Sequence, residues 1–418
     1  RRDDIGQMND LLTAYEVLLA VYKEGAYCNL ELNKRVLGAS NRAIVTRLVY
    51  GVLQKDVELE YYIGKMTAKR PSKTVAVLLK LGMYTLKYID SIPRYAAVDN
   101  LVAICEKYGK RQLKGFVNST LKNFDVAKIQ MPAEPKEKLS VETSTPLWLV
   151  KAYCKQYGYD KTKEFLSVGE FTKEHIRPNL KKWSLSQLKD CLDGEKIDYT
   201  ESGVGGLFVN NSAFIKSLNV SGKITFQSMT SMLAAQAMDV KDGENILDMC
   251  SAPGGKSVYM SQLADVNITA CDIHEHRLEL IKSYIARMSV DKISAVDCDG
   301  TEINEDFVGK FDRTLCDVPC SGLGVVGKKA DIYLNASMEK CLELSQVQYK
   351  ILQNASKYTK RRIVYSTCTT LREENYNVVG KFVKQNQEWQ VVSSKQYLPD
   401  GNGGDGFFIA VLERKNNE

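Results

Sequence analysis

The sequence predicts an α/β domain with a parallel sheet, preceded by an all-helical domain and a small α+β region. Three observations support this fold class. From residue 227 onward, segments with strand and helix patterns alternate, which is typical of a parallel sheet covered on both faces. Residues 245–263 have the pattern of a strand, a glycine turn and a helix. Between residues 9 and 125, apolar side chains recur at helical spacing without the glycine-rich breaks that separate strands.

Length and composition are those of a globular protein with an ample core. The 418 residues allow two or three domains, and 44% hydrophobic with 26% charged residues is an ordinary balance. No apolar run approaches the ~20 residues that a membrane span needs, so we expect no membrane segment. Eleven cysteines in a chain of this length indicate reduced thiols and a cytoplasmic protein. Three histidines without a C-x-x-C pair argue against a metal site, and the net charge of +6 permits an acidic partner without requiring one.

The helical domain is expected to span residues 1–128. Its apolar positions form successive helical stripes: Leu11, Leu12, Tyr15, Leu18, Leu19 and Tyr22, then Ile44, Leu48, Val49 and Leu53, then Val75, Leu78, Leu79, Leu81 and Leu86. Two interpretations of this domain stay open, a packing or regulatory module and a nucleic-acid-binding module. The second depends on scattered basic residues that equally suit a solvated face: Lys34, Arg35, Arg42, Arg47, Lys110, Arg111 and Lys114.

Two regions are expected between the helical domain and the α/β domain. Residues 129–140 are charged, contain two prolines and are predicted to be a linker. Residues 141–226 are predicted to form a small α+β lead-in, with short helices at 148–153 and 162–166 and strands at 207–209 and 223–226.

The α/β domain is expected to span residues 227–418. The expected elements besides those of residues 245–263 are helices at 229–238, 277–288, 338–356 and 373–384 and strands at 268–272, 293–296, 312–316, 363–365 and 406–412. Crossovers between parallel strands are expected to be right-handed.

The glycine turn after the first strand of this domain indicates the kind of ligand. A phosphate-binding P-loop needs glycine at the position of Cys250, and the dinucleotide fingerprint fails because Gly254 and Gly255 are adjacent. The next predicted strand ends in Asp272, an acid placed to bind ribose hydroxyls. A nucleoside cofactor without a pyrophosphate fits this pattern, and S-adenosylmethionine is the commonest one. Asp248 ends the first strand and points an acid at the same place.

Two further strand ends carry thiols. One strand runs into Asp317 and Cys320, and another into Cys368. Because the carboxyl ends of parallel strands meet at one edge of a sheet, we expect both thiols to face one cleft. Carbon 5 of cytosine or uracil is too weak a nucleophile to take a methyl group directly, whereas a thiolate added at carbon 6 activates it. A free thiol with a pKa of ~8.5 is mostly protonated near neutrality, so the nucleophile needs a nearby cation, for which Lys256 is the candidate.

Each of these residues also has a purely structural interpretation. A cysteine at a strand end is most often a small apolar side chain, and Cys271, Cys298 and Cys316 are interpreted in that way. A lone Lys256 would be a solvated helix residue. The glycine turn and both thiol segments, in this order on one α/β domain, favour the catalytic interpretation.

Three segments resemble the signature motifs of the RNA cytosine-5 methyltransferases of the Sun/RsmB/Nop2 type. They are Asp-Met-Cys-Ser-Ala-Pro-Gly-Gly-Lys (248–256), Asp-Val-Pro-Cys-Ser-Gly (317–322) and Tyr-Ser-Thr-Cys-Thr (365–369). The N-terminal region, with Gly-Ala-Tyr (25–27) and Leu-Val-Tyr-Gly (48–51), resembles the NusB-like RNA-binding domain of the bacterial 16S ribosomal RNA branch, and residues 405–408 resemble that branch's closing strand. The resemblance implies a Rossmann-like methyltransferase domain that methylates carbon 5 of one cytosine in small-subunit ribosomal RNA.

The resemblance also implies residue roles. It makes Cys368 the nucleophile, gives Cys320 a part in proton removal and product release, and brings Asp317 to the cytosine, while Lys256 stays the catalytic candidate for the nearby cation. The residues that it assigns to S-adenosylmethionine are Asp248, Cys250, Ser251, Ala252, Pro253, Gly254, Gly255, Lys256, Asp272 at the ribose, Arg277, Asp299 near the adenine, and Asp317. We expect the protein to be a monomer whose partner is ribosomal RNA.

Some positions depart from the family pattern. Residues 327–330 replace a stretch that usually carries arginines and a proline, and residues 360–362 are basic where two glycines are common. These changes leave a second hypothesis open, a non-catalytic RNA-binding or ribosome assembly factor that keeps the methyltransferase fold. A P-loop ATPase is the third hypothesis, and Cys250 in place of glycine counts against it.

Overall fold

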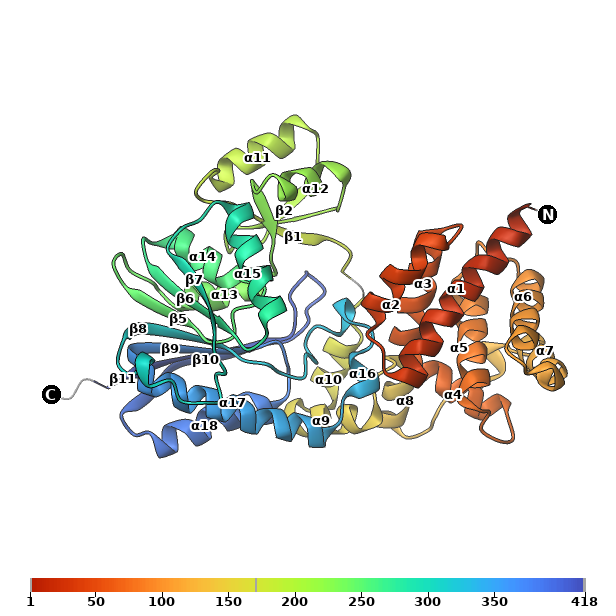
Figure 1. Ribbon diagram of the computed structural model, residues 1–418. Coiled ribbons are helices and arrows are strands. Elements are labelled where there is room, and N and C mark those ends of the chain that lie inside the picture. The colour runs from red at the N-terminus through yellow and green to blue at the C-terminus, as the bar shows by residue number, and fades with distance from the viewer. Residues whose placement is uncertain (1, 170, 416–418) are drawn as a thin grey trace. The chain divides into compact units, whose positions relative to one another are not determined.

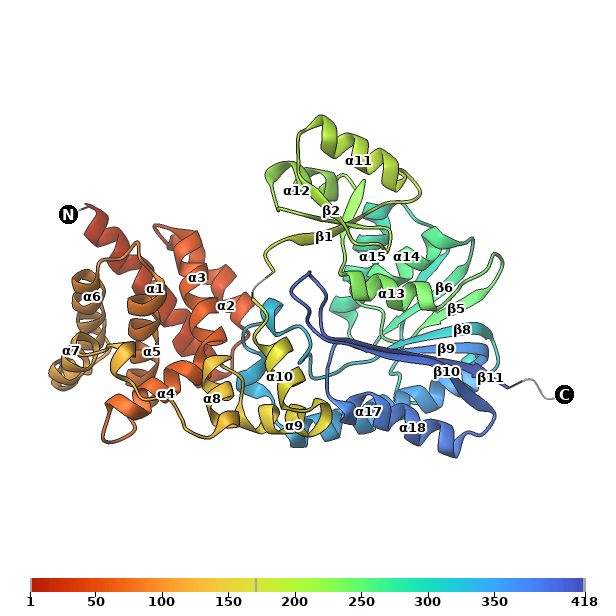
Figure 2. The ribbon, with the colours of Figure 1, turned by 180° about the vertical axis from the view of Figure 1, so that it is seen from behind.

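The helical N-terminal elements form a unit of their own in the computed structural model, which describes residues 2–169 and 171–415 (Figures 1 and 2). The described residues up to Leu166, together with Val326–Asn335, make the first compact unit. The second unit consists of the described residues of Ser167–Val325 and those from Ala336 onward. Within the described ranges, the helices lack the combination of length and apolar character that a membrane span requires.

The first unit is all-helical, as the spacing of apolar residues predicts. Its helices are α1 (Arg2–Glu24), α2 (Cys28–Arg35), α3 (Arg42–Gln54), α4 (Asp56–Met66), α5 (Lys73–Tyr88), α6 (Arg94–Lys107), α7 (Lys114–Lys122), α8 (Pro135–Glu142), α9 (Leu147–Tyr157), α10 (Tyr159–Leu166) and α16 (Ile332–Asn335), with the 3₁₀ helices η1 (Val36–Gly38), η2 (Arg111–Leu113), η3 (Val126–Lys128) and η5 (Val326–Lys328). The central helix is α5, which contacts α1, α3, α4, α6 and α7. Its residues 77–85 are all buried, so the core of this unit surrounds it.

The structure differs from the predicted linker at residues 129–140. Helix α8 begins within this segment, with Pro135 in its first turn and the Glu134 carboxylate accepting a hydrogen bond from the Glu137 amide at 2.7 Å. Proline suits the first turn of a helix because no backbone donor is needed there. Leu139 and Val141 are buried, which anchors the helix. Helices α9 and α10, expected in the α+β lead-in, also belong to the first unit.

A short segment from the C-terminal half of the chain completes the core of the first unit. Ala330 is 1% exposed and packs with the buried residues of the helical unit. The Asp331 carboxylate accepts a hydrogen bond from the backbone amide of Cys28 at 3.3 Å, at the start of α2. Burial raises the pKa of Tyr333 to about 12, while its hydrogen bond with Thr145 acts in the opposite direction. The sequence did not predict that residues 326–335 belong to the first unit.

The second unit contains two sheets. Its strands are β1 (Glu174–Pro178), β2 (Tyr199–Glu201), β3 (Leu207–Val209), β4 (Ile224–Phe226), β5 (Asn245–Asp248), β6 (Asn267–Asp272), β7 (Ile293–Asp297), β8 (Phe311–Asp317), β9 (Thr359–Thr367), β10 (Trp389–Tyr397) and β11 (Phe407–Arg414). Its helices are α11 (Leu185–Gly194), α12 (Ala213–Val220), α13 (Met229–Ala237), α14 (Gly255–Leu263), α15 (Glu275–Met288), α17 (Met338–Tyr358) and α18 (Tyr376–Gln385), with the 3₁₀ helices η4 (Glu305–Phe307) and η6 (Arg372–Glu374).

The smaller sheet is antiparallel, with the strand order β2-β3-β1-β4. Its link to the larger sheet runs through Arg177 of β1, whose side chain is fully buried. The Arg177 guanidinium donates to Gln227 Oε1 at 2.6 Å and to Gln262 Oε1 of α14 at 2.5 Å, and it lies 4.4 Å from the ring centre of Tyr259. Burial lowers the pKa of Arg177 to about 10, so the group stays charged near neutrality. The cation therefore connects the smaller sheet to α14, which packs on the larger sheet.

The larger sheet has the strand order β10-β11-β9-β8-β5-β6-β7. Strands β9, β8, β5, β6 and β7 are parallel, and successive residues along them face opposite helical layers. Ile246, Leu315 and Val364 pack with residues of α13 and α14. Leu247 and Tyr365 pack with residues of α17 and α18 on the other face. Figure 1 shows these two layers on either side of the sheet.

The parallel sheet expected from the alternating elements has an antiparallel edge that the sequence analysis did not predict. Strand β11 is antiparallel to both β9 and β10. A connection of only nine residues, 398–406, joins β10 to β11, and short connections join antiparallel strands. Strand β10 escaped prediction because most of its side chains are exposed, which leaves no apolar run or alternation. The helix predicted at 373–384 also begins later, at Tyr376, because Asn375 has φ −116° and ψ −100°.

Candidate active site

The glycine turn follows the central strand β5 and leads into α14. Gly254 has φ +103°, a left-handed conformation that glycine adopts without a Cβ clash, and it precedes the first residue of α14. Asp248 at the end of β5 is 1% exposed, and its Oδ2 accepts a hydrogen bond from Ser257 Oγ at 2.7 Å. Its Oδ1 has no hydrogen-bond partner among the described residues. Burial, reinforced by the charge of Asp317, raises the pKa of Asp248 to about 6.

The neighbouring strand β6 places Asp272 at the same edge of the sheet. Asp272 is 3% exposed and accepts a hydrogen bond from the His274 amide at 3.2 Å. Arg277 pairs with Asp272 at 3.4 Å and donates to the Ala252 carbonyl oxygen at 3.4 Å, which connects the acid to the glycine turn. After the next strand, β7, the Asp299 carboxylate accepts hydrogen bonds from the amide and hydroxyl of Thr301. The predicted cofactor residues therefore follow three adjacent parallel strands.

Two more parallel strands bring the thiols together. Cys320 follows β8 and Cys368 follows β9, and their Sγ atoms are 3.2 Å apart. The Cys368 amide also donates a hydrogen bond to Cys320 Sγ at 3.3 Å. The pKa of Cys320 lies well above its ordinary value, first because of its hydrogen bond with Cys368, then because of burial and the charges of Cys368 and Glu374. The expectation that both thiols face one site is confirmed.

An ion pair lies beside the thiols. Lys256 Nζ, from the first turn of α14, is 2.5 Å from Asp317 Oδ2 at the end of β8. Asp317 Oδ1 accepts a hydrogen bond from Ser366 Oγ at 2.7 Å, which fixes the second oxygen. Burial lowers the pKa of Lys256, but the charge and hydrogen bond of Asp317 outweigh it, with smaller contributions from Asp248 and Cys368, so the pKa is raised. Lys256 therefore interacts electrostatically with Cys368 and has Asp317 as its direct partner.

Two other cysteines of this edge are packed, whereas Cys298 is only half-buried. Cys316 and Cys271 are fully buried in the layer that faces α17 and α18. Burial is the main cause that raises the pKa of Cys316. Their interpretation as small apolar side chains agrees with this burial. Among residues 2–169 and 171–415, no cluster of three or more histidine, cysteine or acidic side chains is arranged to hold a metal ion.

Two family models match this chain. The NusB family matches residues 8–125, and the 16S rRNA methyltransferase RsmB/F model matches residues 235–413. The probable ribosomal RNA small subunit methyltransferase B of Bacillus subtilis (strain 168) is 31% identical over 441 aligned residues, which cover 96% of this chain and 98% of the relative. The chain belongs to the RsmB family of ribosomal RNA methyltransferases. This membership confirms the family resemblance of the three motifs and of the helical domain.

Other RsmB-family members and solved structures agree with this placement. Ribosomal RNA small subunit methyltransferase B of Photorhabdus laumondii is 28% identical, with 90% of this chain and 91% of the relative covered. The crystal structure of PH0851 matches with a TM-score of 0.81 at 20% identity over 98% of both chains. The structure of NSun6 from Pyrococcus horikoshii with SFG matches with a TM-score of 0.58 at 18% identity, covering 68% of this chain and 99% of that one. At these identities the two structures support the fold.

Two polar residues of the RsmB-family site were missed by sequence reasoning. Glu374 and Asn375 are both fully buried and hydrogen-bond to the segments that carry the thiols. Both residues lie at the start of the helix that the sequence predicts at 373–384, and nothing in the local pattern distinguishes them from neighbouring polar residues. The unusual backbone at Asn375 is visible only in three dimensions.

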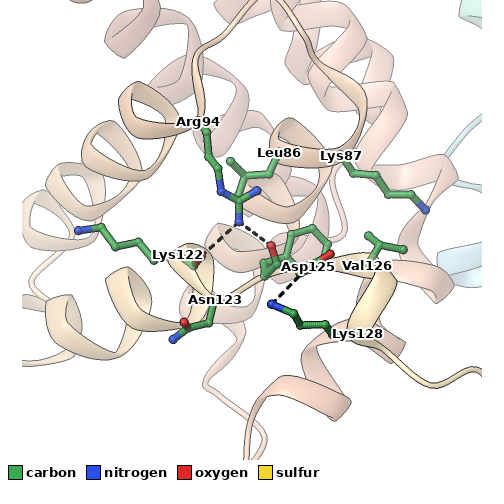
Figure 3. A pocket seen from close by; sticks show the side chains of 9 residues that line it. Leu86, Lys87, Arg94, Lys122, Asn123, Asp125, Val126 and Lys128 are labelled. Carbon is green, nitrogen blue, oxygen red and sulfur yellow. Dashed lines mark hydrogen bonds and ion pairs between the residues drawn. The ribbon is translucent and has the colours of Figure 1, made fainter.

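The helical unit of this RsmB-family chain has a basic pocket of about 410 Å³, shown in Figure 3. Its charged groups hold the local structure together. Arg94 donates to the carbonyl oxygens of Leu121, Lys122 and Phe124 at the end of α7, and Lys128 pairs with Asp125 at 3.3 Å. We therefore place the chemistry in the second unit and not in this pocket.

Proposed function

We propose that the protein transfers a methyl group from S-adenosylmethionine to carbon 5 of a cytosine in small-subunit ribosomal RNA, through a covalent bond between Cys368 and carbon 6 of the base. The observation that carries this proposal is the pair of thiols, with Sγ atoms 3.2 Å apart, beside the Lys256–Asp317 ion pair. Membership of a ribosomal RNA methyltransferase family supports the substrate class.

The residues after β5, β6 and β7 suit a nucleoside cofactor with a positively charged centre. Asp248 offers a buried carboxylate oxygen without a hydrogen-bond partner among the described residues, which a cationic or hydrogen-bond-donating group would satisfy. Asp272 and Asp299 offer acceptors for ribose hydroxyls and for the base. Gly254 leaves the backbone of the turn open to close approach. When bound there, S-adenosylmethionine supplies the methyl group.

The thiols divide the work of base activation and release. Cys368 attacks carbon 6 of the cytosine as a thiolate, which makes carbon 5 nucleophilic enough to take the methyl group. Afterwards the proton on carbon 5 leaves, its electron pair forms the double bond between carbons 5 and 6, and the bond between carbon 6 and sulfur breaks. These changes return Cys368 to its thiolate form.

The base for this proton removal is Cys320. The largest cause that holds its proton is the hydrogen bond with Cys368, and the charge of Cys368 adds to it. Once Cys368 is bonded to the cytosine, both of these causes are lost, while burial and the charge of Glu374 still raise the pKa of Cys320. In our proposal Cys320 gives its proton to solvent at this stage. Cys320 then accepts the proton from carbon 5, and the cycle releases one proton overall.

Asp317 and Lys256 hold the cytosine ring in our proposal. Asp317 is 25% exposed in its side chain, which leaves it accessible to a base, and its orientation is fixed by Lys256 and Ser366. As the thiolate adds, the Lys256–Asp317 pair delivers a proton to ring nitrogen 3, which neutralises the negative charge that the ring gains, and the pair takes this proton back when the thiolate leaves. The helical unit is proposed to bind the RNA, in keeping with its match to the NusB family.

Two cysteine variants test the proposal. Cys368→Ser is expected to abolish methyl transfer from radiolabelled S-adenosylmethionine to ribosomal RNA, because serine does not form the adduct. Cys320→Ser is expected to accumulate a protein–RNA adduct that survives denaturing electrophoresis. Full activity of Cys368→Ser would refute the covalent mechanism.

The non-catalytic alternative makes a different prediction. A ribosome assembly factor that keeps only the fold would bind the RNA but show no heat of binding with S-adenosylmethionine in calorimetry. Bisulfite sequencing of ribosomal RNA from cells that lack the gene would identify the methylated cytosine under our proposal. Under the alternative, that pattern would be unchanged.

A further inference from the structure

The segments that carry the two thiols are both held by a single pair of adjacent, buried residues, Glu374 and Asn375. Each is fully buried, and both lie outside the three motif segments 248–256, 317–322 and 365–369. Adjacent residues have Cα atoms 3.8 Å apart across a planar peptide, so their positions are rigidly related. What each residue binds therefore determines how the two thiol segments lie relative to each other.

Glu374 holds the segment of Cys320. Its carboxylate accepts hydrogen bonds from the amide of Ser321 at 2.9 Å and from the hydroxyl of Ser321 at 2.5 Å. It also accepts from Gln348 Nε2 at 2.9 Å, and the same amide group donates to the carbonyl oxygen of Pro319 at 3.0 Å. Cys320 is thus bracketed on both sides, at Pro319 and at Ser321, by a network centred on one buried carboxylate.

Asn375 holds the segment of Cys368. Its Oδ1 accepts a hydrogen bond from Thr367 Oγ1 at 2.5 Å, and its Nδ2 donates to the Thr369 carbonyl oxygen at 3.0 Å. The same Nδ2 donates to Gln396 Oε1 of β10 at 2.8 Å, which ties the group to the edge of the sheet. Cys368 is thus bracketed at Thr367 and at Thr369 in the same manner as Cys320.

The backbone supports a positioning role. Asn375 has φ −116° and ψ −100°, which interrupts the helix between η6 and α18 and lets both side chains turn inward. The Tyr365 hydroxyl donates to the Glu374 carbonyl oxygen at 2.6 Å, which fixes the peptide between the two residues.

We propose that Glu374 and Asn375 are the positioning residues of the two thiols, with Glu374 setting the place of Cys320 and Asn375 setting the place of Cys368. This inference rests on the proposed covalent mechanism. It adds that two adjacent residues control two different steps, so that a substitution at one of them slows one step more than the other. Loss of Glu374 disturbs proton removal and release, whereas loss of Asn375 disturbs formation of the adduct. A displacement of about 1 Å at a reacting group lowers a rate on the order of 100-fold.

The test compares Glu374→Ala and Asn375→Ala in two assays. The first measures the single-turnover rate of adduct formation on RNA with 5-fluorocytosine at the target position, where fluorine blocks proton removal. The second measures turnover and the fraction of protein held as an adduct on ordinary RNA. Asn377→Ala is the control, because Asn377 is exposed and lies two residues after Asn375.

The inference predicts opposite patterns for the two variants. Glu374→Ala forms the adduct on fluorinated RNA within about threefold of the wild-type rate, but turns over about 100-fold more slowly and accumulates the adduct on ordinary RNA. Asn375→Ala forms the adduct about 100-fold more slowly on fluorinated RNA and accumulates none on ordinary RNA. The control behaves as the wild type in both assays.

Equal losses of both variants in both assays would overturn the inference, as would wild-type turnover of either variant. If an alanine variant fails to fold by thermal denaturation, Glu374→Gln and Asn375→Asp replace it, because each keeps one acceptor oxygen and should show the same pattern more weakly. Wild-type protein that neither methylates RNA nor forms an adduct on fluorinated RNA would instead refute the proposed function itself.

Discussion

Gly324 lies where two catalytic loops touch, and its replacement by alanine tests how tightly Cys368 is held. Its amide donates to the Cys368 carbonyl oxygen at 2.9 Å, and its carbonyl oxygen accepts from the Gly406 amide at 2.8 Å. A Cβ at position 324 would lie 1.9 Å from the Gly406 carbonyl oxygen. Ordinary contact begins at 3.4 Å, so the two backbones must separate by about 1.5 Å, which is 3.4 minus 1.9. Both partners are backbone, so no side-chain rotation relieves the clash.

This displacement acts on the segment that carries Cys368, the nucleophile in our proposal. Where position 324 moves away from Gly406, its hydrogen bond to the Cys368 carbonyl oxygen is distorted. A misplacement of about 1 Å at a reacting group costs on the order of 100-fold in rate. We therefore expect Gly324→Ala to methylate ribosomal RNA about 100-fold more slowly in a radiolabelled methyl-transfer assay, with the affinity for S-adenosylmethionine within about threefold of wild type. Gly327→Ala is the matched control, since no atom lies within 4 Å of a Cβ built there. Activity of Gly324→Ala within about threefold of the control would refute the reasoning.

Three further predictions concern buried charges. Arg177→Met leaves two glutamine oxygens without their donor and is expected to lower the free energy of unfolding, measured in urea, by about 3 kcal/mol. Burial raises the pKa of Asp248 from 3.8 to about 6. This shift stabilises the folded protein below about pH 4, and the contribution is lost as the pH rises through 6. The free energy of unfolding of Asp248→Asn should therefore rise by up to about 3 kcal/mol relative to wild type between pH 4 and pH 8, and a difference that does not change with pH would contradict this. Lys256→Met should cost about 3 kcal/mol by leaving Asp317 unpaired, while the double variant with Asp317→Leu regains most of the stability but no activity.

The parts of the fold that sequence reasoning recovered are those with a strong local pattern. Buried parallel strands such as β5 and β6 have continuous apolar runs, and their boundaries in the structure lie within one or two residues of the predicted ones. Strand β10 has exposed side chains, so only its pairing with β11 makes it a strand. The direction of β11 depends on that hairpin and not on its own residues.

The candidate site divides in the same way. Cys320 and Cys368 were predicted to meet because strand ends in a parallel sheet converge, and they do. The pairing of Lys256 with Asp317 joins α14 to β8, so it depends on the distance between two elements that no local pattern encodes. Glu374 and Asn375 act through hydrogen bonds to residues 6 to 53 positions away, which explains their absence from the sequence-based expectations. The residue roles, the monomeric state and the cytoplasmic location stay predictions.

The contribution of Val326–Asn335 to the helical unit has a consequence for biosynthesis. Ala330 leaves the ribosome 164 residues after Leu166, which is 330 minus 166. At a synthesis rate of about 5 to 20 residues per second, the helical unit waits roughly 8 to 30 s for the segment that fills its core. The N-terminal unit thus finishes folding only after most of the catalytic sheet has been translated. A fragment that ends at Leu166 would expose the apolar site that Ala330 covers, and a synthetic peptide of residues 326–335 would bind to that site.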